Sequence, residues 1–241
     1  MAFKAGRGAQ ILFNQYDVSG YLNAAGVQIG ADTAEVTNFA SAGWKEYMAT
    51  LLGGTFPFAG MYDVAFPVTS QLGVDAGVLT YAPASATAIG DPVFLASITS
   101  TDLQKSSPVG GIVAISWTAT AEAAVAYGQL LHPLAKDTNT TTGASKDDSA
   151  QSTTGWTANL HVTGVDGGSW VIKMQDSADN SSWADVTGGA FSSLSAAGSQ
   201  RLVSASGTTT LRRYVRYIAT RTGGSAGQGV TFALGYSRTN Q

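Results

Sequence analysis

Short runs of alternating apolar and polar residues, closed by glycine-rich turns, constrain the fold of this chain more than any other feature. A period of two puts alternate side chains on opposite faces of a strand, so that one face can be buried. The turn VDGGS joins two such runs into a hairpin. Their inward residues are Trp156, Ala158, Leu160 and Val162 before the turn, and Trp170, Ile172 and Met174 after it. Further alternating runs follow, the last of them at residues 230–236. Residues 156–241 are therefore predicted to form an immunoglobulin-like β-sandwich.

Composition supports a mainly β protein along the whole chain. Among 241 residues there are 29 Gly, and only 12% are charged. Frequent glycine with few charges suits strands joined by many tight turns. The chain has no cysteine, which excludes disulfides and thiolate chemistry, and its net charge of −3 argues against nucleic-acid binding through a basic face.

A polar segment divides the chain. Residues 136–155 contain no large apolar side chain and are predicted to be a linker. Residues 1–135 carry 4 Lys and Arg against 9 Asp and Glu, a net of −5, whereas residues 136–241 carry 9 against 7, a net of +2. We therefore expect an N-terminal domain over 1–135 and a separate sandwich domain over 156–241.

Residues 36–63, VTNFASAGWKEYMATLLGGTFPFAGMYD, are the centre of the first predicted domain. Residues 36–39 are interpreted as a strand end. Apolar residues then follow the spacing of one helix face: Trp44, Tyr47, Met48, Leu51 and Leu52. Gly53 and Gly54 are predicted to end this short helix at a corner, after which residues 55–62 alternate as a strand. The unit should fix the angle between two strands, and its expected fold- or assembly-defining residues are Phe39, Trp44, Tyr47, Leu51, Gly53, Gly54, Phe56, Phe58, Gly60, Tyr62 and Asp63.

Two segments outside this unit also have a predicted conformation. Residues 23–32, NAAGVQIGAD, are interpreted either as a flexible loop or as an arm that orders against a partner. Residues 121–131 are predicted to form a turn followed by a short strand, because a central glycine weakens the helical alternative.

No group of residues predicts catalysis, a cofactor or a metal. His132 and His161 lie in different predicted domains without a second ligand at metal spacing, and both are interpreted as structural. Two aspartate groups, Asp147 with Asp148 and Asp176 with Asp179, lack the pattern of a calcium loop, so plain Asx turns are favoured. The motifs of nucleophilic hydrolases and phosphate-binding loops are absent.

Aromatic residues of the second domain offer one alternative function. Trp156 and Trp170 share the register of the core, but Trp183 lies in a turn and could stack on a sugar. The alternative is a two-domain β binding or decoration protein whose sandwich contacts a glycan or a host surface. The basic strand with Arg212, Arg213, Arg216 and Arg221 is interpreted as a solvated face or an intersubunit contact.

The N-terminus and the apolar runs indicate a soluble protein. MAFKAGRGAQILF lacks an apolar region long enough for a secretory signal, and no run approaches the roughly 20 residues needed to span a bilayer. We expect neither export through a signal peptide nor a membrane partner.

The 36–63 unit resembles the shared segment of the major tail (tail tube) proteins of long-tailed bacteriophages. In that family a Val-Thr-x-Phe strand end leads into a short helix, a Gly-led turn and a strand ending in Gly-aromatic-Asp, matched here by Gly60, Tyr62 and Asp63. Lys45 would correspond to a basic position near the helix, and residues 23–32 to a long loop. The segment GQLLHPLAKDTNTTTGAS before WTANLHV is similar to the junction between a tube domain and an added sandwich.

The resemblance implies a structural virion protein rather than an enzyme. It implies a tail-tube-type β-sandwich or barrel domain, with about six copies per ring that together build a barrel of roughly 24 strands. Stacked rings would form the tube through which DNA passes. The expected partners are other copies, the tape measure protein and DNA in the lumen, and the tail terminator and tail tip proteins, with assembly in the host cytoplasm.

Overall fold

The computed structural model describes residues 8–38, 40–41, 44–65 and 77–240, and nearly all regular structure there is β-strand. One 3-10 turn, Ser19–Tyr21, lies near the N-terminus. In the first half the strands are β1 Gln10–Phe13, β2 Tyr16–Asp17, β3 Leu22–Ala25, β4 Gln28–Glu35, β5 Tyr47–Met61, β6 Gly77–Ala82, β7 Pro92–Ser106, β8 Ala114–Ala121 and β9 Ala126–Asp137. In the second half they are β10 Thr141–Thr142, β11 Lys146–Asp147, β12 Thr157–Val165, β13 Ser169–Ser177, β14 Ala184–Ala190, β15 Gly198–Val203, β16 Tyr214–Thr222 and β17 Val230–Ser237. The predicted mainly β fold is confirmed.

The 15-residue strand β7 organises the first half. Its early residues pair with β6 and β9, and its later residues pair with β8. Strand β8 then pairs with β5, which also pairs with β3 and β4. Phe58 and Trp117 of this second group stack with ring centroids 4.7 Å apart, and Phe13 of β1 packs on Trp117 at 5.0 Å. Strands β5 and β8 therefore enclose a core against β1 and β6.

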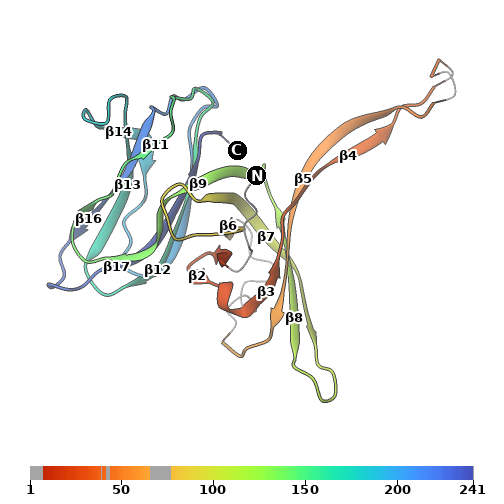
Figure 1. The fold of residues 1–241 in the computed structure, drawn as a ribbon, viewed down its shortest axis with the longest axis horizontal. Coiled ribbons are helices and arrows are strands. Elements are labelled where there is room, and N and C mark those ends of the chain that lie inside the picture. Colours follow the sequence, from red (N-terminus) through yellow and green to blue (C-terminus); the bar gives the residue numbers. More distant parts are fainter. Residues whose placement is uncertain (1–7, 39, 42–43, 66–76, 241) are drawn as a thin grey trace.

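The second half is a two-layer sandwich. One layer is β15–β12–β17–β9, and the other is β14–β13–β16 with the short strands β10 and β11 (Figure 1). Trp156 and Trp170 are fully buried between the layers, as their register predicted. Strand β9 follows the turn at residues 122–125, which confirms the turn and strand predicted for residues 121–131.

Two hairpins project from the first half in different directions (Figure 1). One, here called the arm, consists of β4, residues 47–54 of β5 and the described residues between the two strands, 36–38, 40–41 and 44–46, and it extends away from the sandwich. The other connects β7 to β8, and its end, residues 107–113, is here called the tip. Residues 23–32 form β3 and part of the arm, so the flexible-loop interpretation is wrong. Ordering of this segment against a partner stays a prediction.

The helix predicted over residues 44–52 is wrong. Residues from Tyr47 onward belong to β5 and pair with β4 from Glu35 to Gln28. The helical spacing arose because the arm carries apolar side chains on both of its faces. Neighbouring pairs such as Tyr47–Met48 and Leu51–Leu52 then recur every four residues, which imitates the period of a helix.

The predicted linker is ordered in the structure and belongs to the sandwich. Thr141–Thr142 and Lys146–Asp147 pair with β16, and β9 reaches Asp137 beside β17. Pairing through the backbone needs no apolar side chain, so composition did not reveal it. One sheet also crosses residue 135, where the domain boundary was placed, and independent folding of the two halves stays a prediction.

Polar side chains join the two halves. Asn159 and His161 of β12 point away from the sandwich core and are fully buried. The Asn159 amide donates to the Leu79 carbonyl at 2.8 Å, and His161 contacts the Thr80 hydroxyl through Nε2 at 2.8 Å and the Asn14 carbonyl through Nδ1 at 2.7 Å. No helix in the described residues has the length and apolar content to cross a membrane.

Candidate assembly surfaces

The sheet formed by β3 or β4, β5, β8 and the end of β7 has two contrasting faces. Its inner face holds the buried residues Phe56, Phe58, Ile115 and Trp117. Its other face is built from small and polar side chains that the strand register aligns in rows. This second surface, here called the open face, consists of Thr55, Pro57, Ala59 and Met61 of β5, Ala114, Ser116, Thr118 and Thr120 of β8, and Thr99, Asp102, Gln104 and Ser106 of β7.

The open face carries acidic but no basic side chains in the part of the chain that the structure describes. Asp102 lies within it, and Glu122 borders it, where the carboxylate accepts hydrogen bonds from Ser97 and Thr99 at 2.7 and 2.6 Å. The nearby Lys105 ammonium instead lies over the Tyr62 ring, 4.1 Å from its centroid. A phosphate chain would find no ion-pair partner on this surface.

The same sheet ends in strand edges without a partner among the described residues. From Ser100 onward, the side of β7 opposite β8 has no paired strand among the described residues, since the described part of β6 pairs with β7 only as far as Ile98. At the other end of the sheet, β3 and β4 pair with β5 alone. Unpaired edges offer rows of N–H and C=O groups to another strand.

Large apolar side chains of the arm are exposed to solvent. Trp44 and Leu52 are each 80% exposed and Leu51 is 73% exposed. Ile29, Tyr47 and Met48 are also more than half exposed. Charged groups concentrate near the outer end, where Lys45 and Glu35 form an ion pair at 3.0 Å. Contiguous exposed apolar patches mark interaction surfaces.

Residues of the predicted 36–63 unit separate into two groups. Phe56, Phe58 and Gly60 belong to the buried part of β5, and a side chain at Gly60 would collide with the Tyr21 carbonyl. Trp44, Tyr47 and Leu51 lie on the exposed arm. Tyr62 donates its N–H to the Val113 carbonyl at 2.9 Å, and Asp63 accepts from the Ala65 N–H at 2.8 Å. Phe39 lies outside the described residues. Their role in assembly stays a prediction.

Gly53 and Gly54 do not form the predicted corner. Both lie inside β5, and neither has a positive φ. A Cβ at Gly54 would approach the Val125 Cγ2 atom to 2.6 Å, whereas a Cβ at Gly53 would meet nothing within 4 Å. Gly54 is therefore required for close packing at the base of the arm, and Gly53 is not.

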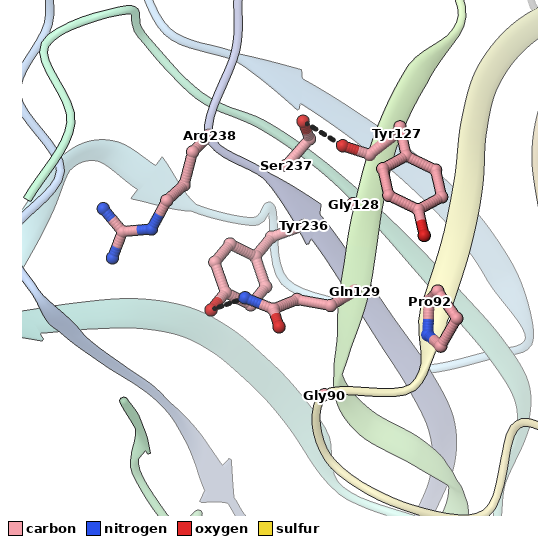
Figure 2. A pocket seen from close by; sticks show the side chains of 8 residues that line it. All are labelled: Gly90, Pro92, Tyr127, Gly128, Gln129, Tyr236, Ser237 and Arg238. Atoms are coloured by element: carbon pink, nitrogen blue, oxygen red, sulfur yellow. Dashed lines mark hydrogen bonds between the residues drawn. The ribbon is translucent and has the colours of Figure 1, made fainter. Parts of the chain in front are cut away.

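A cavity of about 280 Å³ beside β9 and β17 is lined in part by side chains that bond to other protein groups (Figure 2). Tyr236 donates to Asp148 at 2.7 Å, and Gln129 donates to Tyr236 at the same distance. Arg238 uses its Nε for Asp148 and its other nitrogens for Ser152 and backbone carbonyls. Burial raises the pKa of Tyr236. Through Asp148 and Ser152, these contacts hold the predicted linker against the sandwich.

Both histidines are structural in their surroundings. His132 stacks on Phe232 at 4.2 Å between ring centroids and lies 3.8 Å from the Asp137 carboxylate. Burial lowers its pKa, and burial lowers the pKa of His161 to about 4. No group of three metal-ligating side chains occurs in the described residues.

The aspartates considered for calcium are engaged by protein groups. Asp179 accepts from the N–H groups of Ser181 and Ser182 at 2.9 and 2.7 Å, which confirms an Asx turn. These hydrogen bonds lower the pKa of Asp179. The Asp147 carboxylate accepts two hydrogen bonds from Arg213, each of 2.7 Å, which lowers its pKa to about 2.

Trp183 is half-buried, and one face of its ring is already occupied. The Arg216 guanidinium lies 4.0 Å from the ring centroid and donates to the Gln175 amide oxygen at 3.0 and 2.8 Å. A sugar stacking on that face would have to displace this cation. The arrangement does not favour the glycan-binding alternative.

Comparisons with known proteins return solved structures only, because no protein-family model and no curated protein matches the chain. A chain of the virion of a native gene transfer agent particle is 13% identical with a TM-score of 0.41, over 52% of this chain and 98% of that chain. The SPP1 tail tube gives 10% identity and a TM-score of 0.39 over 50% and 77%. The SPP1 Dit protein belongs to the hub adsorption apparatus of phages that infect Gram-positive bacteria. It is 7% identical with a TM-score of 0.36, over 96% of this chain and 99% of that chain.

A tail tube protein is among these neighbours. Similarity of this degree does not reveal the function of the present chain, which depends on its own surfaces. Three details of those surfaces were not predicted from the sequence: the open face, the strands that carry the free edges, and the tip. The tip sequence SPVGGIV, which presents apolar residues in an uncharged turn, was the one available signal.

Proposed function

We propose that this protein is a structural subunit that polymerises into rings and stacked tubes, and that it builds a phage tail tube. The observation that carries the proposal is the four-strand sheet, which buries one face, leaves the other smooth and polar, and ends in two unpaired edges. An enzyme would need convergent reactive groups, whereas this sheet offers edges that another copy can extend.

Sheet continuation is geometrically consistent with a ring. The strands β4, β5, β8 and β7 are antiparallel in succession. Because their number is even, rotation about a common axis brings β7 of one copy antiparallel to β3 or β4 of the next. A ring made in this way leaves no free lateral edge. Six copies are the number that the resemblance implies.

The open face is the proposed wall of the channel. About 24 strands spaced about 4.8 Å apart and tilted about 40° give a backbone diameter of about 48 Å, which leaves room for duplex DNA after side chains are added. Small hydroxyl-bearing residues with Asp102 and Glu122 give phosphates no cation to bind. DNA would therefore slide past this wall. The tape measure protein would occupy the channel before DNA, and terminator and tip proteins would cap the tube.

Assembly would also bury the exposed residues of the arm. Fully burying one Leu or Met side chain contributes about 1.5–3 kcal/mol, so several on each copy supply a substantial driving force. Both faces of the arm carry such residues, and the arm is therefore expected to lie between neighbouring copies. In the cell, this assembly would take place in the host cytoplasm.

Negative-stain microscopy of the purified full chain tests the proposal. Rings or tubes are expected for the natural sequence and for Thr187→Asp, an exposed control position on β14. The double variant Leu51→Asp with Leu52→Asp should fold but assemble poorly. A natural chain that stays monomeric at high concentration would contradict the proposal.

A labelling experiment tests which face lines the channel. The chain has no cysteine, so Ser116→Cys and Thr187→Cys each introduce a single thiol. In tubes, a maleimide carried on a particle wider than the bore should label Thr187→Cys and spare Ser116→Cys. In the dissociated chain both should react. Equal labelling of the two in tubes would place the open face outside.

A further inference from the structure

The arm leaves an empty strand position beside β5. Strand β5 pairs with β8 from Met61 to Thr55, and this pairing stops where the arm begins. From Gly53 outward, β5 has only β4 beside it in the described part of the chain. The position that β8 would occupy, had it continued, is open along residues 47–53.

The tip lies at the opposite end of the same sheet. The register pairs Met61 with Ala114 and Thr55 with Thr120, so the start of β8 adjoins the end of β5. The tip therefore projects from one end of the strands and the arm from the other, and Figure 1 shows them pointing apart. Within a single copy the two cannot meet.

The tip and the inner part of the arm have matching chemistry. Val109 at the end of the tip is fully exposed, and Ile112 is 67% exposed. Neither residues 107–113 nor residues 47–54 contain a charged side chain. Contact between them would bury apolar surface from both sides without desolvating a charge.

We propose that the tip of one copy inserts beside residues 47–53 of the arm of a second copy, displaced along the strand direction. This inference rests on the proposed function, since it assigns the contact between successive rings of the tube. Residues 47–54 extend the arm by about 26 Å at roughly 3.3 Å per residue, which is ample for the seven-residue hairpin end.

Such a contact is heterologous, because it joins two different surfaces of identical chains. A copy whose tip is bound still has a free arm, and a copy whose arm is occupied still has a free tip. Contacts of this kind generate open stacks rather than closed dimers. Lateral pairing at the sheet edges would close the ring, and the tip-to-arm contact would extend the tube.

Chemical cross-linking between two single-cysteine variants tests the proposal in the full chain. Leu52→Cys and Ile112→Cys are both exposed positions, so the substitutions should leave the fold intact. The two variants are mixed, allowed to assemble and treated with a short bis-maleimide. A covalent dimer is expected from the mixture and not from either variant alone. Thr187→Cys mixed with Ile112→Cys is the matched control and should give no dimer.

The outcomes separate the inference from the proposed function. Tubes that form without a dimer between Leu52→Cys and Ile112→Cys overturn the inference alone, as does a dimer from Ile112→Cys by itself, which would mean tip-to-tip contact. The variant Val109→Asp with Ile112→Asp should give rings that do not stack, and normal tubes from it would also overturn the inference. A natural chain that never assembles overturns both.

Discussion

In the C-terminal sandwich Trp156 and Trp170 are completely buried, whereas in the arm Trp44 and Leu52 are each 80% exposed. Both regions are antiparallel β-structure with alternating residues. The sandwich has two layers, so each strand hides its apolar face against the other layer. The arm is a single two-stranded ribbon with no second layer, and isolated ribbons of this kind are at best marginally stable. The sandwich buries its apolar residues against its own second layer, whereas under the proposed function those of the arm are covered by another copy.

The largest expected difference comes from truncating one apolar residue in each region. Trp170→Ala removes a fully buried ring and should lower the free energy of unfolding by about 3–5 kcal/mol. Leu52→Ala should change it by no more than about 0.5 kcal/mol in the unassembled chain, because Leu52 is exposed. Urea unfolding of dilute, unassembled protein measures both. Comparable losses would show that the arm packs on its own chain.

Acid should weaken the contact between β12 and the first half of the chain, because this contact includes His161. Burial lowers its pKa from 6.5 to about 4, so the folded state resists a proton that the unfolded chain accepts. The contribution of His161 to the free energy of unfolding is therefore complete above pH 6.5, and it falls by about 3 kcal/mol as the pH drops to 4. Asn14 and Thr80 face the ring, and Asp17 is the nearby charge that opposes this shift.

Urea unfolding between pH 7 and 4 measures the effect. His161→Gln should remove much of the slope. The remainder belongs to His132, whose pKa burial also lowers, and near pH 4 to carboxylates such as Asp147 and Asp179, whose pKa values hydrogen bonds lower. Since His161 joins β12 to the first half, following each half by its own tryptophans would show whether the two separate in acid. An unchanged slope in His161→Gln would assign the effect elsewhere.

Substitutions at the base of the arm should have a smaller effect on the free energy of unfolding, and the neighbouring Gly53 provides the control for Gly54. Gly54→Val places a side chain against Val125 and Ala121 and should cost about 1–3 kcal/mol. Gly53→Val meets open space and should be nearly neutral in the unassembled chain. Thermal unfolding of the two variants compares them. If Gly54→Val also unfolds residues 156–241, the two halves are one cooperative unit and the predicted domain division fails.

Sequence patterns revealed the sandwich better than the arm for a physical reason. Alternation reports burial on one face, which Trp156, Leu160 and Val162 satisfy. In the arm, Leu51 and Leu52 lie on opposite faces of the ribbon, and such pairs imitate a helix. Asn159 and His161 alternate like solvent-facing residues, although another strand layer covers them. Where a distant segment or another copy covers a strand, the sequence of that strand does not have to alternate, so periodicity does not reveal the burial.

The smallest expected effect compares the two partly exposed tryptophans. Trp183→Ala removes the half-buried ring beneath Arg216 and should cost about 1 kcal/mol, because a cation–π pair contributes about 0.5–1 kcal/mol at an exposed site and more where it is partly buried. Trp44→Ala should leave the unassembled chain unchanged, because Trp44 is 80% exposed. In assembly assays the order should reverse, with Trp44→Ala slowing tube growth and Trp183→Ala leaving it normal. Sedimentation of the two variants before and after assembly measures both. A Trp183→Ala defect in tube growth would mean that the β14–β13–β16 layer of the sandwich also contacts a neighbouring copy.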